Sequence, residues 1–163
     1  SDRQRAPYVG GQRQRPDHAT DVKAVMAWLK QKSPVPVWLV GPSRGTQSGA
    51  YAATELAADG GPDGLVLTAT VLDDPKGRPV PAMAIEKLRI PVLVVHHEQD
   101  ACRVTLPADL PRLMEKLAAN PRKDLVTFRG GVDQGHPCEA RAYHGFNGLE
   151  TEVVQRIAAW MLR

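Results

Sequence analysis

The sequence predicts an α/β domain with three layers, in which a parallel sheet of about four strands lies between helices. Short apolar runs alternate along the chain with segments whose apolar residues recur at helical spacing. The runs are apolar at consecutive positions, which is typical of parallel strands that helices cover on both faces. With 163 residues, 42% of them hydrophobic, the chain is large enough for one core, so we expect residues 1–163 to form a single domain.

The first half of the chain is expected to contain an irregular segment, two helices and two strands. Residues 1–17 are rich in Arg, Gln, Gly and Pro and have no apolar period, so they are predicted to be irregular. Residues 17–32 are predicted to form a helix that ends before the next proline. The apolar positions of this helix are Val22, Val25, Met26 and Leu29. The run over 35–40 predicts a strand, the small residues over 43–58 a helix, and the run over 64–72 a second strand.

The second half continues the same alternation of strands and helices. A short helix is expected over 82–88, a strand over 90–97 and a helix over 107–120. The last strand is predicted over 124–131 and the last helix over 149–163. The buried stripe expected on this last helix consists of Val153, Val154, Ile157 and Met161.

Charge and hydropathy exclude two classes of partner at this stage. The chain has 21 Lys and Arg against 18 Asp and Glu, a formal net charge of +3, which is too weak a balance to predict a nucleic-acid partner. No apolar run approaches the roughly 20 residues that a membrane-spanning helix needs. We therefore expect neither nucleic acid nor a membrane span.

The most informative motif is Gly41-Pro42-Ser43-Arg44-Gly45, which joins the first strand to the helix that follows it. This G-x-S-x-G pattern is typical of a nucleophile elbow, a sharp turn in which the glycines avoid clashes around a strained serine. Ser43 is therefore a candidate nucleophile, and the backbone N–H of Arg44 is a candidate oxyanion donor. The alternative is that Ser43 supplies only the hydroxyl of a tight turn.

A serine nucleophile needs a base to take its proton and an acid to orient that base. His136, in the loop after the last strand, is the predicted base, and Asp100, which follows the strand over 90–97, is the predicted acid. Both lie beyond the carboxyl ends of strands, where parallel sheets place their chemistry. Asp73 and Asp74 also follow a strand and are the alternative acids.

The other histidines have competing interpretations. His144 is an alternative base, although its surroundings are those of a loop. Asp133 is expected to cap that loop through its side chain. His96 and His97 end a strand and are expected to be partly buried and hydrogen-bonded to nearby backbone groups, whereas His18 is expected to face solvent.

The motifs, with the spacing between them, resemble the α/β-hydrolase superfamily from about residue 18 onward. The stretches that carry the resemblance are "VWLVGPSRGTQSGAYAA", "IPVLVVHHEQDAC" and "GGVDQGHPCEA". The resemblance implies a triad of Ser43, Asp100 and His136, and hydrolysis of a small-molecule carboxylic ester through an acyl-enzyme, with no cofactor and no metal. The alternatives are a non-catalytic module that binds a ligand or partner through the same cleft, and an acyltransferase that uses the same triad.

The chain departs from the superfamily pattern in one respect, because it is expected to hold only the second half of the fold. The nucleophile strand lies near the middle of the sheet in the superfamily, and here it is the first strand. The strand over 35–40 would then be an apolar edge, which a preceding half of the fold or another chain should cover. The second oxyanion donor, which the superfamily takes from the first half, has no candidate in this sequence.

The two cysteines stand in equivalent places relative to the predicted acid and base. Cys102 is two residues after Asp100 and Cys138 is two residues after His136. If that acid and base touch, the two sulfurs come together, and a disulfide would fix the two loops. Two free thiols and a zinc site remain alternatives. A disulfide favours an oxidising compartment, so a periplasmic or secreted location is expected, with a cytoplasmic one still open.

Overall fold

The computed structural model describes residues 9–163, and the sheet within them is parallel, as the apolar runs predict. Its strands are β1 (Trp38–Pro42), β2 (Gly64–Thr68), β3 (Val92–His97) and β4 (Lys123–Phe128). They lie side by side in the order of the chain, and every neighbouring pair is parallel. All four carboxyl ends therefore meet at one edge of the sheet.

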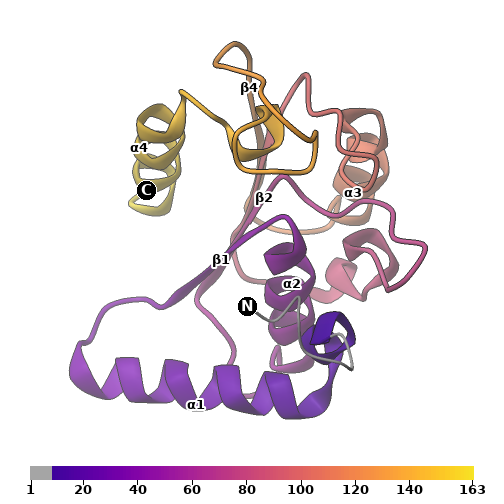
Figure 1. Cartoon of the computed structure of the whole chain (residues 1–163). Helices are drawn as coiled ribbons and strands as arrows, with labels where there is room; N and C mark the ends of the chain where they lie inside the picture. The colour runs from indigo at the N-terminus through magenta and orange to yellow at the C-terminus, as the bar shows by residue number, and fades with distance from the viewer. Residues whose placement is uncertain (1–8) are drawn as a thin grey trace.

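Helices lie on both faces of this sheet, as expected for a three-layer α/β fold. They are α1 (Pro16–Lys32), α2 (Arg44–Glu55), α3 (Leu110–Lys116) and α4 (Glu150–Met161). Figure 1 shows α2 and α3 on one side of the strands and α4 on the other, with α1 crossing the lower end of the molecule near α2. The remaining helical elements are the 3₁₀ turns η2 (Val9–Gln14), η3 (Val80–Ala82), η4 (Ile85–Lys87), η5 (Pro107–Asp109) and η6 (Tyr143–Gly145).

Several elements have other bounds than the sequence predicts: β1 is Trp38–Pro42 rather than 35–40, β2 ends at Thr68 rather than at 72, and α3 is Leu110–Lys116 rather than 107–120. Two further segments differ in kind. The helix expected over 82–88 is replaced by η3 and η4, two short turns. The segment expected to be irregular contains η2, and α1 begins at Pro16 because proline suits the first turn of a helix. The expectation for residues 1–8 lies outside the described part of the chain.

The sheet separates two hydrophobic cores. Successive side chains of a strand point to opposite faces. Leu65 and Val94 accordingly join the core under α2 and α3, whereas Val66 and Leu93 join the core under α4. Every residue of β2 and β3 is buried, which makes these strands the rigid centre of the molecule.

Two expected helical stripes are only partly buried. On α1, Met26 is buried, but Val25 is 58% exposed. On α4, Val154 is 63% exposed, and Trp160 is buried instead. The indole of Trp160 packs edge-on against Trp38 with ring centroids 5.8 Å apart, and its Nε1 donates to Asp124 at 2.5 Å. The large ring therefore sets which face of α4 contacts the sheet.

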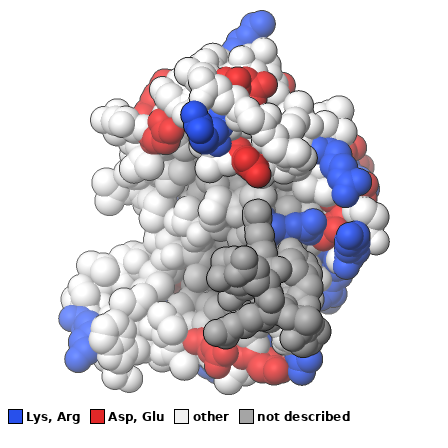
Figure 2. Space-filling model, in the orientation of Figure 1, with Lys and Arg blue, Asp and Glu red and all other residues white. Residues whose placement is uncertain are grey.

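The surface of the molecule carries no large region of one charge on the face in Figure 2, where basic and acidic residues are interspersed between uncharged areas. None of the helices within residues 9–163 combines the length and the apolar character that crossing a membrane requires.

At the outer side of β1, Val40 is 52% exposed, and no further described strand pairs with β1. The apolar edge expected in the sequence is present.

We predict that Gly64→Ala destabilises the fold. A Cβ at Gly64 would lie 2.3 Å from the ring of Trp38, and a rigid indole cannot yield without disturbing its contact with Trp160. The free energy of unfolding should fall by about 1–3 kcal/mol in urea titrations. Gly11→Ala is the control, because nothing lies within 4 Å of a Cβ there. Equal midpoints for the two variants would contradict the packing described for Trp38.

Candidate active site

Ser43 lies in a strained turn between β1 and α2. Its backbone angles are φ 49 and ψ −120, a region that residues with a Cβ rarely occupy. A Cβ at Gly41 would lie 2.4 Å from the carbonyl oxygen of Gly45, so the turn requires glycine at that position. The Ser43 hydroxyl makes no capping hydrogen bond to α2. The hydroxyl of Ser43 therefore does not cap α2.

The backbone of the turn is held from both sides. The Ser43 N–H donates to the carbonyl of Thr68 at the end of β2 (2.9 Å), and the N–H of Thr46 donates to the Ser43 carbonyl (2.8 Å). Arg44 is the first residue of α2, so its own N–H has no acceptor within the helix. That amide is available to a ligand oxygen beside Ser43.

Asp100 is the buried centre of a second group of residues. Its side chain has no exposed surface and accepts three hydrogen bonds: from the Cys102 N–H (2.9 Å), the Thr105 hydroxyl (2.8 Å) and Nδ1 of His144 (2.9 Å). With its proton on Nδ1, the imidazole of His144 presents Nε2 as an acceptor. Nε2 is buried and has no partner among residues 9–163.

The structure corrects the expected partner of Asp100. His136 is exposed, and its Nδ1 accepts only the local N–H of Cys138 at 3.2 Å. The loop after β4 continues past Cys138 and turns back at η6, which brings His144 rather than His136 to the carboxylate. Gly145 makes this return possible, since a Cβ there would lie 2.2 Å from the carbonyl oxygen of Ala140.

The remaining histidines and Asp133 have structural contacts. Nε2 of His96 lies 2.7 Å from the Thr105 carbonyl and Nε2 of His97 lies 2.9 Å from the Gly130 carbonyl, so both have the expected backbone partners. Both rings are fully rather than partly buried, and Nδ1 of His96 has no partner among residues 9–163. Asp133 accepts the N–H of Tyr143 at 3.3 Å, the expected capping role. His18 differs from its expectation, because it is half-buried and contacts the hydroxyl of Ser48 on α2 at 2.6 Å.

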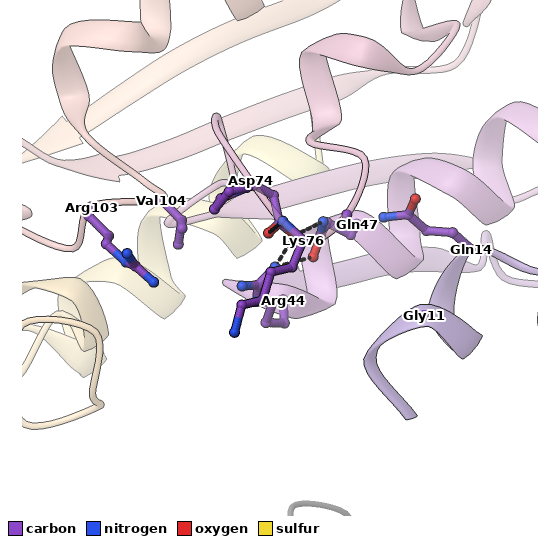
Figure 3. Close-up of a pocket in the computed structure, with 10 residues that line it drawn as sticks. Gly11, Gln14, Arg44, Gln47, Asp74, Lys76, Arg103 and Val104 are labelled. Carbon is purple, nitrogen blue, oxygen red and sulfur yellow. Dashed lines mark hydrogen bonds and ion pairs between the residues drawn. The ribbon is translucent and has the colours of Figure 1, made fainter. Parts of the chain in front are cut away.

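The alternative acids lie elsewhere. Asp73 is exposed, and Asp74 is buried in a network with Arg44 and Gln47 (Figure 3). The guanidinium of Arg44 contacts the Asp74 carboxylate, Gln47 Nε2 donates to it at 2.9 Å, and the Lys76 N–H donates at 3.0 Å. Burial alone would raise the pKa of Asp74, but these hydrogen bonds from Gln47, Lys76 and Arg44 hold that pKa below its ordinary value.

The disulfide between Cys102 and Cys138 is present in the structure. It joins the turn that holds Asp100 to the loop that holds His144. Neither cysteine is a free thiol, so the free-thiol and zinc alternatives do not apply.

Backbone strain gathers at the same edge of the sheet. Among residues 9–163, three residues other than glycine have positive φ: Ser43, Ala69 and Phe146. Ser43 and Ala69 directly follow β1 and β2, and Phe146 lies two residues after His144. Strained residues persist only where the surrounding structure fixes them, and they cluster at functional sites. The carboxyl edge of the sheet is therefore the candidate active site.

Comparison with solved structures agrees with this architecture. A protein of Xanthomonas campestris, a member of the α/β serine hydrolases without a lid, superposes with a TM-score of 0.54 at 21% identity, over 85% of this chain and 56% of that one. The present chain has an α/β-hydrolase-like fold. An esterase domain of a Rhodothermus marinus protein superposes with a TM-score of 0.49 at 17% identity, over 69% of this chain and 57% of the domain. A scan against models of protein families finds no match, and neither does a search of curated proteins.

The chain spans just over half the length of these two solved chains. Sequence reasoning missed two features of the site within that span. Thr105 donates to Asp100, but a threonine five residues after an acid forms no recognisable motif. The side chain of Arg44 binds Asp74, whereas the motif gave a role only to its backbone.

We predict that His96 makes the protein less stable as the pH falls. Burial lowers the pKa of His96 below its ordinary value of 6.5, against opposing contributions from Thr105 and Asp100. The unfolded chain therefore binds the proton more readily, and the free energy of unfolding decreases as the pH drops through about 6.5, by up to about 1.4 kcal/mol per pH unit.

Urea titrations at about pH 7.5 and pH 5.5 measure this dependence. In His96→Leu, which has no titrating group at this position, the difference in stability between the two pH values should shrink. An unchanged difference would mean that His96 is not buried in its neutral form.

Proposed function

We propose that the chain is the catalytic part of a serine hydrolase that cleaves a small-molecule carboxylic ester. Ser43 is the nucleophile, His144 the base and Asp100 the acid that orients it, and the Arg44 N–H is one oxyanion donor. This assignment keeps the predicted nucleophile and acid and replaces His136 with His144. The observation that carries it is the buried His144 ring, held by Asp100 at Nδ1 and without a partner at Nε2.

The sheet supports this assignment. β1 and β3 lie on either side of β2, so the turns after them are about 10 Å apart at one edge, given a strand spacing of about 4.8 Å. An imidazole that approaches from the loop after β4 and is already bound to Asp100 has one free nitrogen for the serine side of this gap. In hydrolases of this kind the base must carry its proton on the nitrogen that faces the acid.

The proposed reaction has two steps. Nε2 of His144 takes the proton of Ser43 as Oγ attacks the ester carbonyl, and the N–H of Arg44 binds the oxygen that becomes negative. The imidazolium, stabilised by Asp100, then gives the proton to the leaving alcohol, which leaves an acyl-enzyme. His144 next removes a proton from water as the water oxygen attacks the acyl carbonyl, and the imidazolium then returns that proton to Oγ of Ser43 as the carboxylic acid leaves.

The free edge of β1 belongs to the same proposal. The exposed Val40 and the partial coverage of the solved structures support a further polypeptide segment that pairs with this strand and supplies the second oxyanion donor. Whether that segment belongs to a longer chain or to a separate one, activity has to be assayed on the form of the protein that contains it.

A fluorophosphonate probe tests the assignment of the base. The probe should label the parent protein at Ser43, and Ser43→Ala should abolish labelling. His144→Gln should slow labelling by about 100-fold or more, because general base catalysis contributes about that factor. His136→Gln is the matched control and should label at the rate of the parent.

The opposite result would contradict this assignment. If His136→Gln lost labelling and His144→Gln kept it, His136 would be the base. A folded parent protein that is never labelled would favour the non-catalytic binding module.

We also propose that the Cys102–Cys138 disulfide keeps His144 in place, which fits a protein of an oxidising compartment. The bond closes a separation of 36 residues, so its loss should cost about 2–4 kcal/mol of stability. The double variant Cys102→Ser, Cys138→Ser should unfold at lower urea and label more slowly at Ser43.

Thiol titration of the parent protein, denatured but not reduced, checks that the disulfide is present. No free thiol is expected before reduction. A double variant that labels at the parental rate would show that the hydrogen bond to Asp100 is sufficient to position His144.

A further inference from the structure

A pocket of about 440 Å³ lies next to the start of α2 (Figure 3). Four segments line it: the start of α2, the loop after β2 and the turn after β3, all from the carboxyl edge of the sheet, and η2 through Gly11 and Gln14. Arg44 adjoins Ser43, so their Cα atoms are about 3.8 Å apart. Arg103 is three residues after Asp100 in the same turn. Two residues of the lining are therefore close in the chain to Ser43 and to Asp100.

The charged side chains of this pocket are mostly cationic. Arg44, Lys76 and Arg103 line it, and among residues 9–163 Asp74 is the only acidic residue in its lining. The carboxylate of Asp74 is 3% exposed and already bound by Arg44, Gln47 and the Lys76 N–H. It therefore neutralises and holds the Arg44 guanidinium and has little capacity left for the other two cations.

Lys76 and Arg103 remain available to a ligand. Both residues are exposed, and neither side chain has a hydrogen-bond or ion-pair partner within the part of the chain that the structure describes. Gln47 contributes a buried amide to the same lining, fixed by the Asp74 carboxylate and the Arg78 carbonyl (3.0 Å). Both Nε2 protons of Gln47 are used in these two bonds, so Lys76 and Arg103 are the donors that remain for an anion with several acceptor oxygens.

We propose that this pocket binds a carboxylate of the substrate, so that the preferred ester is an anionic one, a monoester of a short dicarboxylic acid. The inference rests on the proposed function, because it requires Ser43 to attack an ester whose charged end lies in the neighbouring pocket. Arg103 and Lys76 bind the free carboxylate, while the ester carbonyl lies at Ser43 and the Arg44 N–H. The two cations then determine specificity and form no bond with the ester carbonyl that reacts.

The kinetic test compares two esters that differ in charge. The 4-nitrophenyl monoester of succinic acid is anionic. The neutral analogue is the mixed diester in which the free carboxylate of that compound carries a methyl group. We expect kcat/KM to be at least about tenfold higher for the anionic ester, since hydrogen bonds to a charged group have about this effect. The preference should decrease as salt is added, because exposed cations are screened.

Variants of the two cations locate the effect. Arg103→Gln and Lys76→Gln should each lower the ratio of the two kcat/KM values, and the double variant should bring it close to one. Arg112→Gln and Lys87→Gln are the matched controls, because both residues are exposed and lie outside this pocket. They should retain the parental ratio.

A binding measurement separates this inference from the proposed function. Monomethyl succinate, titrated into the ¹⁵N-labelled protein, should shift the backbone amides of residues 76 and 103, and Arg103→Gln should weaken that binding. Binding without hydrolysis of either ester would support the pocket and overturn the esterase proposal. Equal hydrolysis of the two esters, or no binding of monomethyl succinate, would overturn the pocket.

Discussion

The buried carboxylate of Asp100 is the constraint on which the arrangement of the site depends. A carboxylate without exposed surface must be surrounded by donors, because an unpaired buried charge costs several kcal/mol. Its donors come from its own turn and from His144, which is 44 residues away in the chain. The hydrogen bonds to this one carboxylate therefore fix both the turn after β3 and the loop that holds His144. The disulfide joins these same segments covalently, so the position of the histidine is determined twice.

The rigid centre of the sheet explains why strained turns can persist at its edge. β2 and β3 are buried along their whole length and support cores on both faces. Ser43 is tied to the end of β2 through its amide, and the amide of Ala69 donates to the Val95 carbonyl of β3 at 3.0 Å. The positive φ angles of Ser43 and Ala69 are thus held by strands that cannot shift. The geometry at the serine follows from packing elsewhere.

Most of the fold was predictable from the sequence, because consecutive apolar residues and helical spacing report burial directly. The strained turn at Ser43 was predictable too, since the glycine pattern directly follows a strand, and so was the place of Asp100 beyond the end of β3, although not its burial. The partner of the acid was not. The loop after β4 has no periodic pattern, and which of its histidines turns inward depends on the buried Phe146 and on close packing of Gly145. The prediction of the buried face of α4 was also partly wrong, because the large ring of Trp160 is buried and Val154 is exposed.

Arg44 connects the nucleophile turn with the charge of the neighbouring pocket. Its backbone begins α2 beside Ser43, and its side chain binds Asp74, whose lowered pKa keeps the carboxylate ionised near neutral pH. The pair is close to neutral as a unit, so the field in this region comes from Lys76 and Arg103. Positive charge together with the amino end of α2 favours negative charge on any group bound at the serine. The same residues that would select an anionic substrate would therefore also favour the oxyanion that forms from it.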